Sequence, residues 1–179
     1  VSGRATGGEF TLRGSPGRFP FDHGDGLFET RFQVNDMVLD YTPGWPRLEK
    51  LAAAVTFRNR TLQVEASGGR LLDAHVERIT ARIDDLAESV VQVKGRAKGS
   101  SATMWRAFQD SPAGRDLKED LPNPRWTGTS TLDLELSIPL DPRPNQIRGR
   151  VGLLDNGLTL PAWNLDLERL RGEARFTDS

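Results

Sequence analysis

The residues of this chain that could do chemistry are two histidines and one acidic turn. Only His23 and His75 could act as general bases near neutral pH. His23 lies in the run Asp22-His23-Gly24-Asp25-Gly26, whose oxygen and nitrogen atoms could bind a metal ion. The spacing matches neither an EF-hand loop nor a zinc-binding pair, so a solvent-exposed turn is the favoured interpretation. His75 is expected at the surface or edge of a strand.

Other motifs of enzymes and cofactor sites are weak or missing in the sequence. Gly95-Arg-Ala-Lys-Gly99 resembles a phosphate-binding loop only superficially, because the spacing is short and no lysine follows the second glycine, so a strand end is favoured. The chain has no cysteine, no nucleophile elbow, no HExxH pair and no dinucleotide-binding glycine motif. We therefore predict no enzyme, no cofactor and no metal, and keep a hydrolase using Asp22, His23 and Asp25 as a minor alternative.

Charge and hydropathy exclude two further classes of protein. The 24 basic and 25 acidic residues are spread along the 179-residue chain, so no basic stripe for nucleic acid is expected. The longest apolar run is Leu51 to Val55, far below the roughly 20 residues that span a bilayer. The first residues do not begin a signal peptide, so we expect that this segment itself does not cross a membrane and that any anchor lies elsewhere.

Alternation of apolar and polar residues with a period of two dominates the sequence. It is clearest in Thr131 to Leu140, where Leu132, Leu134, Leu136 and Ile138 share one face. Further strands are predicted at 27–34, 37–41, 51–57, 61–66, 70–75, 76–83, 90–99, 148–154, 158–160 and 165–176. Asn35-Asp36 and Asp155-Asn156-Gly157 are typical of hairpin turns between strands. The pattern predicts a mostly β fold.

One stretch follows a helical period instead. Met104, Trp105 and Phe108 are spaced as on a helix, after serines suited to capping and before Ser111-Pro112. We predict a short helix at 100–110, with a second turn at 114–120. The helix is expected to cover an end or edge of the sheet.

Two parts of the sequence are similar to each other. The pattern of 55–64 recurs at 151–160, and that of 76–83 recurs at 167–174. We predict a single segment, 1–179, with repeat-like halves at about 27–99 and 127–176 and a helical insertion at about 100–120. Chance similarity among short β patterns is the alternative.

Apolar alternation has two explanations that the pattern does not separate. A sheet that faces its own core and a sheet that faces a ligand have the same alternation. The residues alone favour a closed core. Many strands with an apolar face and one short helix to cover them favour an open face.

Several segments resemble one family of envelope proteins. They include Phe19-Pro-Phe21, Gly24-Asp-Gly26-Leu-Phe28, Tyr41-Thr-Pro43-Gly-Trp45-Pro46 and Phe108-Gln-Asp-Ser111-Pro112. Together with shorter matches up to Asn156-Gly157-Leu158, they resemble the YhdP branch of the AsmA-like envelope proteins over most of the chain.

The resemblance implies a longer parent protein, anchored in the inner membrane and reaching through the periplasm. This chain would be an internal segment that joins adjoining segments of the same long chain. Its fold would be an elongated, curved, antiparallel-rich sheet with one or two short helices. That sheet would form an apolar groove along which phospholipid acyl chains move between the inner and outer membranes. The lipid-binding candidates are Val55, Phe57, Leu62, Val64, Leu132, Leu134, Leu136, Ile138, Val151, Leu153, Leu158, Leu160, Leu165 and Leu167. The alternative is a structural or assembly scaffold of the envelope whose sheet edges bind partner proteins.

Overall fold

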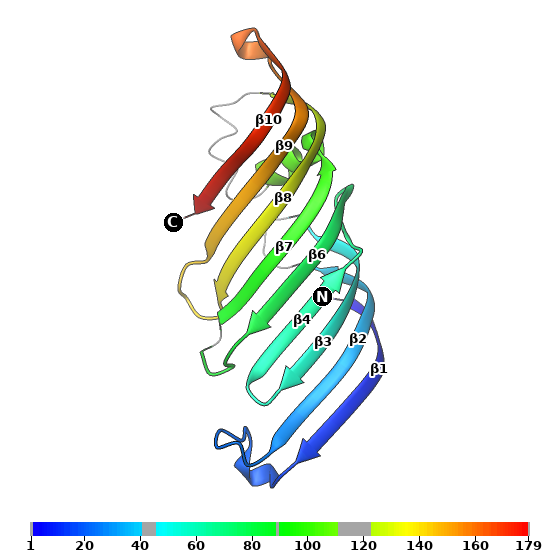
Figure 1. The fold of residues 1–179 in the computed structure, drawn as a ribbon, viewed down its shortest axis with the longest axis vertical. Coiled ribbons are helices and arrows are strands. Elements are labelled where there is room, and N and C mark those ends of the chain that lie inside the picture. Colours follow the sequence, from blue (N-terminus) through cyan, green and yellow to red (C-terminus); the bar gives the residue numbers. More distant parts are fainter. Residues whose placement is uncertain (1, 41–45, 89, 111–122, 179) are drawn as a thin grey trace.

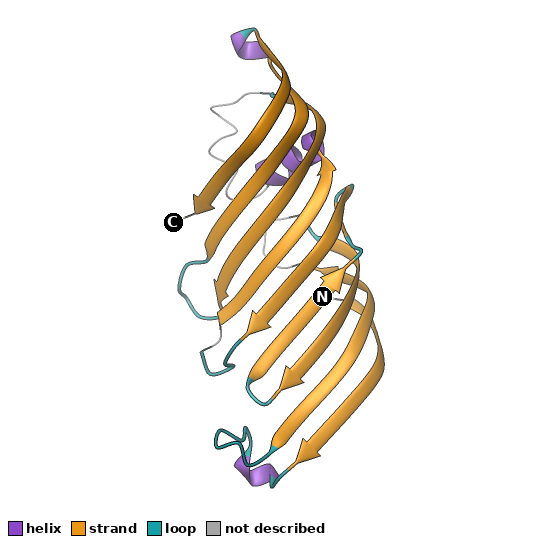
Figure 2. Ribbon diagram, viewed as in Figure 1, coloured by secondary structure: helices purple, strands orange, loops and turns teal. Residues whose placement is uncertain are grey.

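The described chain is built on one antiparallel sheet, shown in Figures 1 and 2. The computed structural model describes residues 2–40, 46–88, 90–110 and 123–178. The strands are β1 (Ser2–Arg13), β2 (Leu27–Leu39), β3 (Leu48–Arg58), β4 (Thr61–Ser67), β5 (Arg70–Leu71), β6 (Ala74–Ile83), β7 (Val90–Ser100), β8 (Arg125–Pro139), β9 (Gln146–Leu160) and β10 (Leu165–Asp178). Strands occupy 69% of the described residues, which confirms the prediction of a mostly β fold.

The sheet is a long meander that does not close on itself. Strands follow one another in chain order from β1 to β10, except that the short β5 pairs with β3 and β6. Figure 1 shows β1 and β10 at opposite ends of a long, curved stack of strands. The accessible surface is 11527 Å², whereas a compact monomer of this mass would expose roughly 8,600 Å². An elongated, open sheet explains the additional surface.

The predicted helix forms where the capping serines placed it. Helix α1 (Ser101–Gln109) begins after Ser100, whose side chain accepts a hydrogen bond from the Thr103 N–H. It packs against β7 and β8 on one face of the sheet (Figure 2). Two single turns of 3₁₀ helix, η1 (Pro16–Arg18) and η3 (Pro161–Trp163), lie at strand ends. The second helical turn predicted at 114–120 lies outside the described residues.

Two predicted hairpins are wrong, because each proposed turn is a bulge inside one long strand. Asp36 has a φ of 51° within β2 and Asp155 a φ of 62° within β9, and the strand register shifts beside both. β2 stays paired with β1 and β3 on both sides of Asp36, and β9 stays paired with β8 and β10 on both sides of Asp155, so the chain does not reverse at either aspartate. One left-handed residue within a continuously paired strand makes a bulge.

The similarity between 55–64 and 151–160 therefore covers two different structures. Residues 55–64 form a true hairpin, in which Asn59 has a φ of 49° and Arg58 pairs with Thr61. Residues 151–160 belong to the continuous strand β9.

The predicted strand 70–75 is two strands in the structure, because β5 ends at Leu71 and β6 begins at Ala74. Strand β1 had no predicted counterpart, and the division into repeat-like halves stays a prediction.

The tightly packed core is small and lies beneath α1. One cluster of buried residues joins Ala107 of α1 to Leu51, Ala53, Ala66, Leu71 and Val76 of the sheet. A second cluster joins Met104 of α1 to Ala74 and Ala97. The other apolar side chains of the same sheet face are mostly half-buried, so α1 covers only part of that face.

Candidate functional site

One face of the sheet is apolar from β2 to β9. Directly opposite residues on paired strands point to the same face. Strand pairing aligns one apolar side chain per strand from β2 to β9: Phe32, Val55, Val64, Ala81, Val93, Leu136 and Ile147. We call this face, with the cavities above it, the trough.

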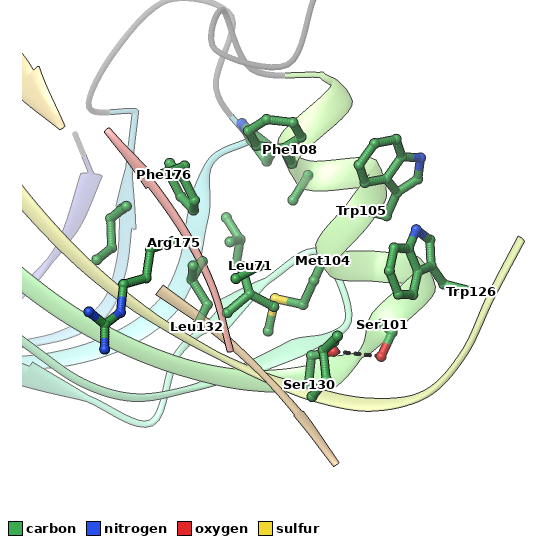
Figure 3. A pocket seen from close by; sticks show the side chains of 16 residues that line it. Leu71, Ser101, Met104, Trp105, Phe108, Trp126, Ser130, Leu132, Arg175 and Phe176 are labelled. Carbon is green, nitrogen blue, oxygen red and sulfur yellow. Dashed lines mark hydrogen bonds between the residues drawn. The ribbon is translucent and has the colours of Figure 1, made fainter. Parts of the chain in front are cut away.

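Two adjoining cavities occupy the trough. The first has a volume of about 240 Å³ and lies between α1 and strands β8 to β10 (Figure 3). The second has a volume of about 140 Å³ and lies over strands β2 to β8. Leu71, Leu132 and Leu134 line both cavities, so the two cavities are neighbours on the apolar face.

Half of the predicted lipid-binding residues line these cavities. They are Val64, Leu132, Leu134, Leu136, Ile138, Val151 and Leu153. Val151 pairs with Leu132 across β8 and β9, so these residues form one surface. Assignment of a lipid to them remains a proposal.

The other predicted residues share the trough face but lie outside the cavity linings. Val55 and Phe57 are opposite Val64 and Leu62 in the β3–β4 hairpin. Beyond the β9 bulge, Leu158 is opposite Trp126 and Leu167, and Leu160 is opposite Leu165. Leu160 is buried, whereas Leu165 is 39% exposed.

Several lining residues had not been predicted. Ile79, Ala81 and Val93 alternate with polar residues, so the same period-two signal could have found them. Trp126 gave no such signal, because the next positions at the same period are Gly128 and Ser130, which are not apolar. Phe176 lines the cavity because it packs against Phe108 of α1, with ring centroids 5.7 Å apart.

The opposite face of the sheet carries charge. Arg96, Asp133, Arg150 and Glu173 form a row across strands β7 to β10, joined by ion pairs of 3.6, 2.9 and 3.4 Å. Asp133 and then Glu173 raise the pKa of Arg150 above its ordinary value. Exposed ion pairs contribute little to the free energy of folding, but their charged groups are well hydrated. The sheet therefore has one charged, solvent-facing side and one apolar side.

The acidic turn is an exposed turn before β2, as favoured from the sequence. Arg60 binds both carboxylate oxygens of Asp22, at 2.6 and 2.8 Å, and lowers the pKa of Asp22. Arg18 binds Asp25 at 2.9 Å. Both carboxylates are thus paired with arginine, and no group of three metal-binding side chains occurs among the described residues. His75 is exposed on β6, opposite Lys98.

Comparisons with known proteins point to one family. A family model described as YhdP protein matches residues 1–179. The intermembrane phospholipid transporter YhdP of Escherichia coli (strain K12) is 27% identical over 184 residues, which cover 100% of this chain and 14% of that relative. The chain thus spans a small part of the relative's length. No solved structure matches the chain significantly.

Among the described residues, no helix has both the length and the apolar character that crossing a bilayer requires.

Proposed function

The chain belongs to the YhdP family, and on that premise we propose that it is a non-enzymatic segment that shields phospholipid acyl chains in its trough. The parent protein is anchored in the inner membrane, spans the periplasm and carries phospholipid between the inner and outer membranes. The E. coli relative is named a transporter of phospholipid between membranes, which supports this assignment.

The observation that carries the proposal is the open apolar face. The linings of both cavities are almost entirely aliphatic or aromatic, and α1 contributes lining residues to the first cavity only. A contiguous exposed apolar surface on a protein is typical of a binding surface. A linear hydrocarbon chain fits this surface because it needs no fixed polar contacts.

The trough lowers the free energy of an acyl chain that has left its membrane. Transferring one methylene from a bilayer to water costs about 0.8 kcal/mol of free energy, so moving a tail of about fifteen methylenes into water costs about 12 kcal/mol. An apolar surface removes most of that cost. Hydrophobic contact is non-directional, so the chain is free to slide along the strands' side chains.

The two edge strands of the sheet can pair with strands from adjoining segments of the same long chain. Among the described residues, β1 pairs only with β2 and β10 pairs only with β9. Uncovered edge strands invite pairing with other chains. Strands of adjoining segments would cover both edges and extend the trough beyond this segment.

A photo-crosslinking experiment tests the proposal on two neighbouring residues of β8. Leu134 lines both cavities, whereas Glu135 lies on the charged face and forms a 3.1 Å ion pair with Lys94. A photoreactive residue at 134 should capture phospholipid in cells, and the same residue at 135 should not. Equal capture at both positions would show that the apolar face is not the lipid site.

The open edges also favour the second candidate function, an envelope scaffold that binds partner proteins by adding strands. That function predicts protein crosslinks along β1 and β10 to other chains. It also predicts a purified protein without bound lipid in mass spectrometry. Bound phospholipid together with crosslinks only within the parent chain would exclude it.

A further inference from the structure

The side chain of Phe176 lies across the floor of the trough beside the first cavity. In the strand register, Leu134 of β8 is opposite Gly149 of β9, and Gly149 is opposite Phe176 of β10. All three positions therefore belong to the trough face. Gly149 is buried, and a Cβ built there would overlap three atoms of the Phe176 ring. The ring thus occupies the space above β9 that a side chain at 149 would fill.

The same ring reaches helix α1. The ring centroids of Phe176 and Phe108 are 5.7 Å apart, and both residues are half-buried and line the first cavity. Helix α1 packs on β7 and β8, so this contact joins the helix to a strand two places beyond β8 in the sheet. Phe176 therefore fills the space between the floor of the trough at Gly149 and the helix.

The contact completes a row of aromatic rings that begins on β8 and ends on β10. The ring of Trp126 in β8 lies 6.3 Å from that of Trp105 in α1, and the ring of Trp105 lies 5.8 Å from that of Phe108. Figure 3 shows the four rings in succession along one side of the first cavity, from Trp126 to Phe176. None of the described residues that line the second cavity is aromatic. Aromatic rings thus enclose the first cavity and not the second.

We infer that Phe176 is a gate between the first cavity and the β10 edge of the trough, closed when its ring lies over Gly149 and against Phe108. An acyl chain that moves from Leu134 toward β10 meets this ring, so the ring must swing away before the chain passes. The inference rests on the proposed function and adds a step at which the movement of lipid is controlled.

The closed gate is weak enough to open. The pairing of the two rings favours the closed position by only about two- to twelvefold. The apolar area that the rings expose when they separate is covered again by the acyl chain that enters between them. Among the described strands, β10 pairs only with β9, so no described strand on its other side restricts the Phe176 ring.

A reversible crosslink tests the gate in the full-length protein. This chain has no cysteine, so the double variant Phe108→Cys and Phe176→Cys can be joined by a thiol-reactive crosslinker that reduction cleaves. The crosslink holds β10 against α1. A photoreactive residue at 134 should still capture phospholipid in the locked protein. Transfer of labelled phospholipid between the membranes, in cells that depend on this protein for it, should fall at least about tenfold and recover on reduction.

The matched control joins two residues on the opposite face of the sheet. Lys94 of β7 and Glu135 of β8 form an exposed ion pair of 3.1 Å, so Lys94→Cys and Glu135→Cys can be joined by the same reagent. This crosslink leaves Phe108 and Phe176 unchanged, so transfer should continue at the rate of the protein without crosslinker. An equal loss of transfer in both crosslinked proteins would overturn the gate.

A second measurement follows the ring itself. In the purified chain, a fluorinated phenylalanine at 176 should give the ¹⁹F signal of a packed ring, and bound phosphatidylglycerol should add the signal of a solvent-exposed ring. Gly149→Ala should show the exposed signal without lipid, because its Cβ overlaps the closed ring. The same label at Phe21, which is 2% exposed in the loop before β2, should not respond to lipid. A signal at 176 that stays unchanged while lipid binds would show that the ring does not move.

The outcomes separate the gate from the proposed function. Capture of phospholipid at 134 together with undiminished transfer in the locked protein would overturn the gate, and the acyl-chain trough would stand. Failure of the photoreactive residue at 134 to capture phospholipid without any crosslink would contradict the proposed function itself.

Discussion

Asn156 fixes the bulge of β9 to its neighbours. Its side chain is fully buried, its amide nitrogen donates to Ser101 and to the carbonyl oxygens of Thr127 and Thr129, and its amide oxygen accepts from the Leu154 N–H at 2.6 Å. One residue therefore connects β9, β8 and the start of α1. It holds the wall of the first cavity in place.

Removing this side chain should be costly. Asn156→Ala leaves buried backbone groups without partners, so we expect the free energy of unfolding to fall by about 2–4 kcal/mol. The neighbouring variant Asp155→Asn should stay within about 0.5 kcal/mol of wild type, because asparagine tolerates positive φ and the ion pair of Asp155 is exposed. Urea unfolding measures the free energy of unfolding of both variants. Similar losses for the two variants would show that Asn156 has no special role.

The sequence could not distinguish this buried amide from an ordinary turn residue. Asp155-Asn156-Gly157 has the composition of a hairpin turn, and asparagine is common in such turns. Its hydrogen-bond partners Ser101 and Thr127 are distant in sequence, so no local residue pattern predicts them. Trp126 was not predicted for another local reason, since Gly128 and Ser130 separate it from the apolar alternation that begins at Leu132.

At the scale of elements, the sequence was most informative where a residue pattern is compatible with only one local structure. The alternation in Leu132 to Ile138 and the capping serine of α1 each correspond to a single local structure, and both predictions are confirmed. Turn residues are less decisive, because the same aspartate serves in a hairpin or in a bulge. The pairing of strands on both sides decides between them, as for Asp36 between β1 and β3.

Helix α1 offers a prediction at this scale. Ser100 accepts from the Thr103 N–H at 3.1 Å and also bonds the Thr103 hydroxyl at 2.8 Å. Ser100→Ala should therefore lower the free energy of unfolding by about 1 kcal/mol. Amide hydrogen exchange should become faster in α1 and remain unchanged in β3 and β4.

Ser67→Ala is the control for that variant. Ser67 is an exposed serine at the end of β4, and its replacement should change stability by less than about 0.5 kcal/mol. If exchange in α1 is as slow in Ser100→Ala as in Ser67→Ala, the cap does not hold the helix against the trough.

For the whole molecule, the sequence pattern did not predict that the apolar face of the sheet is left open. Alternation predicted an apolar face, but it did not say whether other parts of the chain fill the space above that face. That depends on how ten strands curve and on where a nine-residue helix lies. The resemblance to YhdP proteins, carried by segments such as Phe19-Pro-Phe21, supplied the open arrangement as an expectation.

A single charge placed in the trough should test its continuity. Gly95 lines the second cavity, and a Cβ built there meets only the Ile79 side chain at 3.7 Å and the Arg78 carbonyl oxygen at 4.0 Å, so a side chain fits. Gly95→Glu should lower co-purified phospholipid at least about tenfold, because the apolar surface then holds a carboxylate. Gln92→Glu adds the same charge to the exposed face of the same strand and should keep wild-type lipid. A folded Gly95→Glu protein with full lipid content would show that acyl chains do not pass over β7.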